Sequence, residues 1–189
     1  MPRLFVAIAL PDEVKRDLAR IALGVPGARW LEDDELHLTL RFIGEVDGDV
    51  FRDLLDGLAP IEAAPFDLTL KGVGHFPPRG EPRILWVGVE KSEALLQLRS
   101  KVEGAVVRAG LPPEKRKFAP HVSIARLRNT PIAKVGNYLT AYGLFRAGPF
   151  PVEEFCLFSS QLGAKRAVYC LEETYPLGAA LNEAARSTR

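Results

Sequence analysis

The chain has 189 residues, of which 47% are hydrophobic, so it is long enough to bury a sizeable core. Its 25 basic and 24 acidic residues leave a formal net charge of +1, which excludes attraction to nucleic acid or an anionic membrane through overall charge alone. Any phosphate ligand must therefore be held by a local site. No apolar run approaches the roughly 20 residues of a membrane-spanning helix and no secretory signal opens the sequence, so we expect a cytoplasmic protein.

Strand-like and helix-like segments alternate along the first half of the chain. Apolar runs and period-two patterns predict strands, and apolar residues spaced three and four apart predict helices. A segment with three prolines and a glycine, residues 75–82, predicts a loop. The predicted strands are 4–10, 28–31, 36–43, 66–70 and 84–89, and the predicted helices are 14–22, 50–58 and 95–106.

The second half repeats the landmarks of the first. Pro65-Phe66 recurs as Pro149-Phe150, and the tetrapeptide starting at His37 recurs at His121, both 84 positions later. Shared spacing of distant landmarks indicates an internal duplication. We therefore predict an α+β fold made of two αβαββ-type units, with two antiparallel-rich sheets around a central cleft. The prediction is one bilobal domain over 1–189, with repeats around 4–84 and 85–175, tightly associated lobes and a tail over 178–189.

The repeated tetrapeptides place a histidine and a hydroxyl residue together in each half. Residues two apart on a strand point to the same face, so His37 shares a face with Thr39, and His121 with Ser123. Hydrolysis of a cyclic phosphodiester needs one group to deprotonate water and another to protonate the departing ribose oxygen. Two imidazoles can share that work at neutral pH. The pattern predicts His37 and His121 as catalytic residues, with Thr39 and Ser123 binding the phosphate oxygens of the substrate.

Other interpretations of these residue types remain open. A single His-x-Thr segment is typical of a half-buried strand histidine, but two at equivalent positions favour function in a chain with only three histidines. A zinc site from His37, His75 and His121 is less favoured, because no carboxylate or thiolate stands at a supporting spacing. We expect no metal and no cofactor. Cys156 and Cys170 are expected to be reduced thiols in the core.

On these motifs the sequence resembles the 2H phosphoesterases, and among them the LigT/ThpR-like RNA 2′,3′-cyclic phosphodiesterases. The resemblance covers nearly the whole chain and implies a bilobal fold with a central cleft. It also implies metal-free conversion of a 2′,3′-cyclic end to a 2′-phosphate, with kinship to reversible 2′,5′-RNA ligase chemistry, and favours His37 as the acid and His121 as the base. The flanking matches include Arg3-Leu4-Phe5-Val6-Ala7-Ile8, Leu85-Trp86-Val87-Gly88, Phe118-Ala119-Pro120-His121 and Tyr175-Pro176-Leu177.

The resemblance adds two substrate-binding residues, Phe42 and Arg126. Each lies five residues after its histidine, and the two differ by 84 positions. In the family the aromatic ring lies against the base and the arginine near the phosphate. Strict alternation along a strand would put both on the face opposite the histidines, so a bulge or a strand end is needed to bring Phe42 into the cleft. Core packing is the alternative for Phe42.

The sequence and its resemblance thus predict an RNA 2′,3′-cyclic phosphodiesterase that acts on RNA ends or cyclic nucleotides, and we expect a monomer. Two alternatives stay open, a non-catalytic RNA-end or nucleotide-binding module and a 2H phosphoesterase acting on another cyclic nucleotide. Residues 115–117, all basic, could guide an RNA backbone into the cleft, and Tyr169 could line it.

Overall fold

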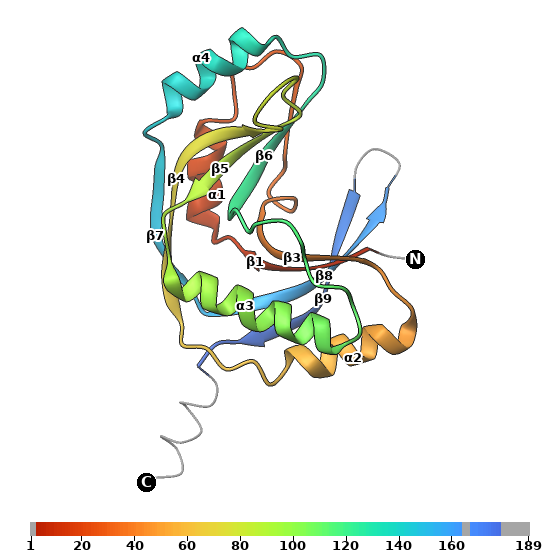
Figure 1. Cartoon of the computed structure of the whole chain (residues 1–189). Helices are drawn as coiled ribbons and strands as arrows, with labels where there is room; N and C mark the ends of the chain where they lie inside the picture. Colours follow the sequence, from red (N-terminus) through yellow and green to blue (C-terminus); the bar gives the residue numbers. More distant parts are fainter. Residues whose placement is uncertain (1–2, 164–166, 179–189) are drawn as a thin grey trace.

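The computed structural model describes residues 3–163 and 167–178. Within this part of the chain, strands and helices follow one another in the order shown in Figure 1. The strands are β1 (Arg3–Ala9), β2 (Ala28–Trp30), β3 (His37–Glu45), β4 (Phe66–Phe76), β5 (Ile84–Val89), β6 (His121–Leu127), β7 (Arg146–Val152), β8 (Glu154–Leu162) and β9 (Ala167–Pro176). The helices are α1 (Asp12–Arg20), α2 (Gly48–Leu58), α3 (Glu93–Arg108) and α4 (Ile132–Tyr142).

The segments expected from the sequence are confirmed, with shifted ends. The largest shift is in β4, which was expected to end at Leu70 and continues to Phe76. His75 is therefore a strand residue and not part of the predicted loop. Residues 179–189, most of the predicted tail, lie outside the described residues.

The described strands form one antiparallel sheet in the order β7-β4-β5-β6-β3-β1-β8-β9, with β2 beside β6. At the centre of this order β3 meets β6 through one register pair, Leu38 opposite Val122. We call the strands on the β6 side, β2 included, the β6 half-sheet, and those on the β3 side the β3 half-sheet. The predicted α+β class is confirmed, and the two predicted sheets are joined at this single pair. The division into repeats stays a prediction.

Helices α1 and α3 each follow a strand of one half-sheet and pack against the other half-sheet. Helix α1 follows β1 of the β3 half-sheet but packs near β7 and α4, whereas α3 follows β5 of the β6 half-sheet but packs against α2 and β3 (Figure 1). The Tyr138 hydroxyl of α4 donates to the Ile21 carbonyl just after α1, at 2.8 Å. Each half of the chain thus supplies a helix to both half-sheets, and the two halves bury one shared core.

Side-chain caps fix where the helices on the β3 half-sheet begin. The Asp47 carboxylate accepts hydrogen bonds from the backbone N–H groups of Asp49 and Val50, at 3.1 and 2.9 Å. The Ser92 hydroxyl accepts from the N–H of Leu95 at 3.2 Å. Such caps satisfy N–H groups that have no partner inside the helix, so they define the start of α2 and α3. Among the described residues no helix is long and apolar enough to cross a membrane.

Candidate active site

A cleft with a volume of about 1480 Å³ lies between the half-sheets, with walls drawn from both. All six residues predicted for the site line it, and so does Tyr169. Of the basic run over 115–117, Arg116 and Lys117 line the cleft. The six predicted residues are His37, Thr39, Phe42, His121, Ser123 and Arg126.

The junction between β3 and β6 brings the two histidines together. His37 is the first residue of β3 and His121 the first of β6, and each directly precedes a member of the Leu38–Val122 pair. Because the strands are antiparallel, residues that precede a register pair are diagonal neighbours on one face, which in regular sheets stand about 7–8 Å apart. That separation leaves room for a phosphate group between two imidazoles. Leu38 and Val122 themselves are fully buried in the core.

Each histidine strand also carries a bulge at an equivalent position. The pairing of β3 with β1 skips Leu40, and the pairing of β6 with β5 skips Ile124, again 84 positions apart. An extra residue reverses the alternation of side chains beyond it. Phe42 and Arg126 therefore lie on the cleft face, whereas strict alternation would have placed them on the opposite face. The Phe42 side chain is 55% exposed, so core packing is the wrong interpretation for it.

Aromatic rings enclose the His37 imidazole. Its ring centroid lies 4.8 Å from that of Phe5 and 5.3 Å from that of Tyr169, which meets it edge-on at 81°, and Phe158 lies behind at 6.5 Å. Burial among these rings is the largest cause that lowers the pKa of His37 from 6.5 to about 4. A hydrogen bond to the Glu35 backbone and the Glu35 carboxylate oppose this shift. The ring is consequently neutral near pH 7.

His121 has a more open environment. Its Nδ1 lies 2.7 Å from the Ala119 carbonyl oxygen, in an exposed hydrogen bond, and the Phe76 ring meets it edge-on at a centroid distance of 4.9 Å. The Trp86 ring lies further back, with its centroid 6.3 Å from that of the imidazole. The indole packs directly on Gly74, where a Cβ would stand 2.2 Å from it. Phe76 and Trp86 therefore support His121 from one side only.

Both imidazoles are oriented in the same way. His121 uses Nδ1 for the carbonyl two residues before it, and His37 is hydrogen-bonded to the backbone of Glu35, also two residues before it. A carbonyl only accepts, so in His121 the proton is assigned to Nδ1 and the lone pair to Nε2. Each strand start thus fixes its own histidine ring, leaving the remaining ring nitrogen for a substrate.

Apart from Tyr169, the sequence did not reveal the aromatic neighbours of the two histidines. Phe5 belongs to an apolar run whose five central residues are all buried, so no polar residue marks which face it takes. The register identifies that face, because Phe5 pairs with Phe42 and Ala7 with Thr39. Phe76 was expected in a loop, and the extension of β4 places it in the cleft wall.

The remaining histidine and the cysteines lie elsewhere. His75 on β4 is not among the residues that line the cleft, so the three histidines do not form one site. No group of three or more potential metal ligands occurs among residues 3–163 and 167–178. Cys156 is buried, with burial raising the pKa of its thiol, whereas Cys170 is exposed, so the expectation of two core thiols was wrong for Cys170.

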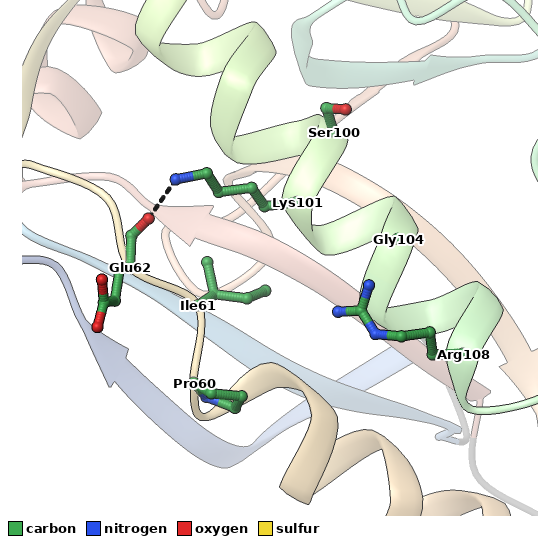
Figure 2. A pocket seen from close by; sticks show the side chains of 7 residues that line it. All are labelled: Pro60, Ile61, Glu62, Ser100, Lys101, Gly104 and Arg108. Atoms are coloured by element: carbon green, nitrogen blue, oxygen red, sulfur yellow. Dashed lines mark hydrogen bonds between the residues drawn. The ribbon is translucent and has the colours of Figure 1, made fainter.

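A second hollow, of about 370 Å³, lies between α3 and the segment that follows α2 (Figure 2). Within it Lys101 donates a hydrogen bond to the Glu62 carbonyl (Figure 2). It contains no histidine, and it shares no residue with the cleft. The chemistry predicted from the sequence therefore belongs to the cleft alone. The lining residues of the second hollow are Pro60, Ile61, Glu62, Ser100, Lys101, Gly104 and Arg108.

The fold and the paired histidines define a known class of protein. The model of the 2′-5′ RNA ligase superfamily matches residues 10–164, and the chain belongs to this superfamily. The resemblance seen in the sequence is thereby confirmed.

Individual members of the superfamily are similar to this chain over most of its length or over part of it. A Thermus thermophilus protein named RNA 2′,3′-cyclic phosphodiesterase is 35% identical over 187 residues, which cover 93% of this chain and 90% of that protein. A Geobacillus stearothermophilus protein with the same name is 37% identical over 128 residues, 65% of this chain, and the match spans 41% of its length. The crystal structure of E. coli LigT complexed with 3′-AMP has a TM-score of 0.76 at 29% identity, covering 94% of this chain and 99% of LigT.

Proposed function

We propose that this protein hydrolyses RNA 2′,3′-cyclic phosphates to 2′-phosphates, with His37 and His121 as an acid–base pair. The observation that carries the proposal is the pair of oriented imidazoles flanking the Leu38–Val122 junction inside one cleft. Two oriented rings on opposite sides of a phosphate are what an in-line displacement requires. The names of the relatives and the binding of 3′-AMP by LigT support an RNA-end substrate.

In the proposed reaction a water molecule attacks phosphorus while the bond from phosphorus to the ribose O3′ breaks. His121 takes a proton from the water through Nε2, and His37 gives a proton to the departing O3′, so the phosphate stays on O2′. The acid must carry a proton, and the negative charge of a bound cyclic phosphate raises the pKa of His37 above its value of about 4. This division of roles follows the family resemblance.

The other cleft residues act on binding and on the charge of the transition state. The hydroxyls of Thr39 and Ser123 donate to the non-bridging oxygens, and the Arg126 guanidinium compensates their charge. The exposed Phe42 ring offers a face on which the terminal base stacks. If a ribose 5′-hydroxyl replaces water as the attacking group, the same displacement makes a 2′,5′ linkage, so ligation is a second outcome of one mechanism.

The test is hydrolysis of a short RNA that ends in a 2′,3′-cyclic phosphate, in excess EDTA, with the product isomer identified. We expect chelator-resistant activity giving a 2′-phosphate, and a loss of about 10²–10⁴-fold in kcat in His37→Ala and in His121→Ala. The matched control is His75→Ala, which removes the histidine outside the cleft and should keep full activity. A wild-type protein that binds RNA ends without turnover would make a non-catalytic binding module the better conclusion.

A cytoplasmic location and a monomeric state complete the proposal. Light scattering after size-exclusion chromatography measures the molar mass, and so the oligomeric state, directly. A mass near the 20.8 kDa of one chain is expected, and twice that mass would refute the monomer.

A further inference from the structure

The cleft is larger than a terminal nucleotide needs. Its volume of about 1480 Å³ exceeds the roughly 300–1,000 Å³ of sites that hold a single small ligand. One of its walls is the segment between α3 and β6, residues 109–120, which we call the α3–β6 loop. This loop leads directly into His121.

Ion pairs anchor the α3–β6 loop to β3 and α3. The Arg41 guanidinium of β3 lies 2.8 Å from the Glu103 carboxylate of α3 and 3.6 Å from that of Glu114 in the loop. It also donates to the Pro112 carbonyl at 2.6 Å, and Glu103 accepts from the Glu114 backbone N–H at 2.7 Å. Arg41, Glu103 and Glu114 have mostly buried side chains, so the pairs are shielded from solvent and hold the loop in one position.

The anchored loop presents two cations and an aromatic ring to the cleft. Arg116, Lys117 and Phe118 all line it, and the Arg99 guanidinium lies 5.5 Å from the centroid of the Phe118 ring. Among the described residues Lys117 has no ion-pair partner, while Arg116 pairs with Glu114 at 3.0 Å.

The charge balance of this wall favours an anion. Two carboxylates, Glu103 and Glu114, pair with three guanidinium groups. These groups belong to Arg41, Arg99 and Arg116. The wall therefore has an excess of positive charge, to which Lys117 adds. The opposite wall differs, because its Arg3 lies 3.6 Å from the Glu45 carboxylate, which also lines the cleft. An additional phosphate therefore finds an uncompensated cation only on the α3–β6 loop and at Arg126, among the cleft residues that the structure describes.

We propose that Arg116, Lys117 and Phe118 form a subsite for the nucleotide on the 5′ side of the terminal one. The two cations bind the phosphodiester that links the two nucleotides, and the Phe118 ring offers the upstream base the face that Arg99 does not cover. An RNA end has this phosphate and a free mononucleotide does not, so the subsite selects RNA over cyclic mononucleotides. The inference rests on the proposed function and adds to it the length of substrate recognised.

The test compares kcat/KM for a cyclic mononucleotide and for a dinucleotide ending in a 2′,3′-cyclic phosphate. We expect the wild type to prefer the dinucleotide, and Lys117→Ala to lose about tenfold on the dinucleotide with little change on the mononucleotide. Lys115→Ala is the matched control, since it removes the same charge from the same loop outside the cleft lining. On a dinucleotide with an uncharged methylphosphonate linkage, Lys117→Ala should have no larger effect on kcat/KM than Lys115→Ala.

Equal kcat/KM for the two substrates in the wild type would overturn the subsite, as would equal effects of Lys117→Ala and Lys115→Ala. A loss of activity on both substrates in Lys117→Ala would also overturn it, because the lysine would then act on the reacting phosphate. No turnover of either substrate would refute the proposed function instead. In that case calorimetric binding of a dinucleotide 2′-phosphate against the mononucleotide 2′-phosphate decides on the subsite alone.

Discussion

The two halves of the cleft use the same tetrapeptide pattern in different surroundings. His37 lies among Phe5, Phe158 and Tyr169, and its pKa is lowered to about 4, whereas the half-buried His121 has Phe76 as its nearest aromatic ring. Both rings are oriented by the backbone two residues earlier, so their orientation comes from the local sequence. The difference in burial comes from strands far along the chain. Similar motifs can thus hold similar geometry while distant strands surround them differently.

The largest expected difference between the halves is in stability. Phe5 is 3% exposed and contacts His37, Phe42, Phe158 and Tyr169, so Phe5→Ala should lower the free energy of unfolding by about 3–5 kcal/mol. Phe76→Ala, on the His121 side, should cost less, because that ring is only half-buried. Urea denaturation of both variants measures the difference. Equal losses would show that the two surroundings are energetically alike.

A second difference should appear as pH is lowered. The pKa of folded His37, about 4, lies below its unfolded value of 6.5, so the unfolded state binds the proton first as pH falls. The contribution of His37 to stability is therefore fully present above pH 6.5 and is lost between pH 6.5 and 4, by about 3 kcal/mol.

The measurement is the free energy of unfolding against pH for the wild type and for His37→Gln. The variant should lack this part of the slope, so the difference between the two curves should shrink or reverse toward pH 4. His121→Gln keeps His37 and is the control that should retain the slope. Parallel curves for wild type and His37→Gln between pH 6.5 and 4 would contradict the buried environment of His37.

The smallest effect on stability is expected at Phe42, which the bulge at Leu40 brings into the cleft. Because its side chain is 55% exposed, Phe42→Ala should change the free energy of unfolding by no more than about 0.5 kcal/mol. If the ring stacks on the terminal base, KM for the cyclic substrate should rise, since base–aromatic stacking contributes about 1–3 kcal/mol. Steady-state kinetics and urea denaturation on the same preparation separate the two effects, and a large stability loss with unchanged KM would assign Phe42 to packing.

Local patterns were enough to predict the strands β1 to β5, the helices α1 to α3 and the residue types that line the cleft. The paired histidines and their hydroxyl neighbours were found because the amino-acid sequence alone shows the period-two alternation and the constant offset of 84 positions. Tyr169 was predicted by the same offset and does line the cleft. The family followed from these residues and is confirmed by the matched model.

The features missed from the sequence are those set by pairing between distant strands. The skips at Leu40 and Ile124 exist only relative to β1 and β5, so alternation alone put Phe42 and Arg126 on the wrong face. Likewise Arg41 could not be recognised as an anchor, because its partners Glu103 and Glu114 come from a helix and a loop more than sixty residues away. Long-range register and long-range ion pairs leave no periodic signature.

The single pair that joins β3 to β6 also determines what a change in cleft width would do. Leu38 and Val122 are fully buried, and both histidines stand next to them, so the catalytic rings lie at the axis about which one half-sheet would turn against the other. Displacement in a rotation grows with distance from its axis. The outermost strands, β7 and β9, would therefore move most while the imidazoles kept their separation. An arrangement of this kind would keep the spacing of the two imidazoles constant while the width of the cleft changed.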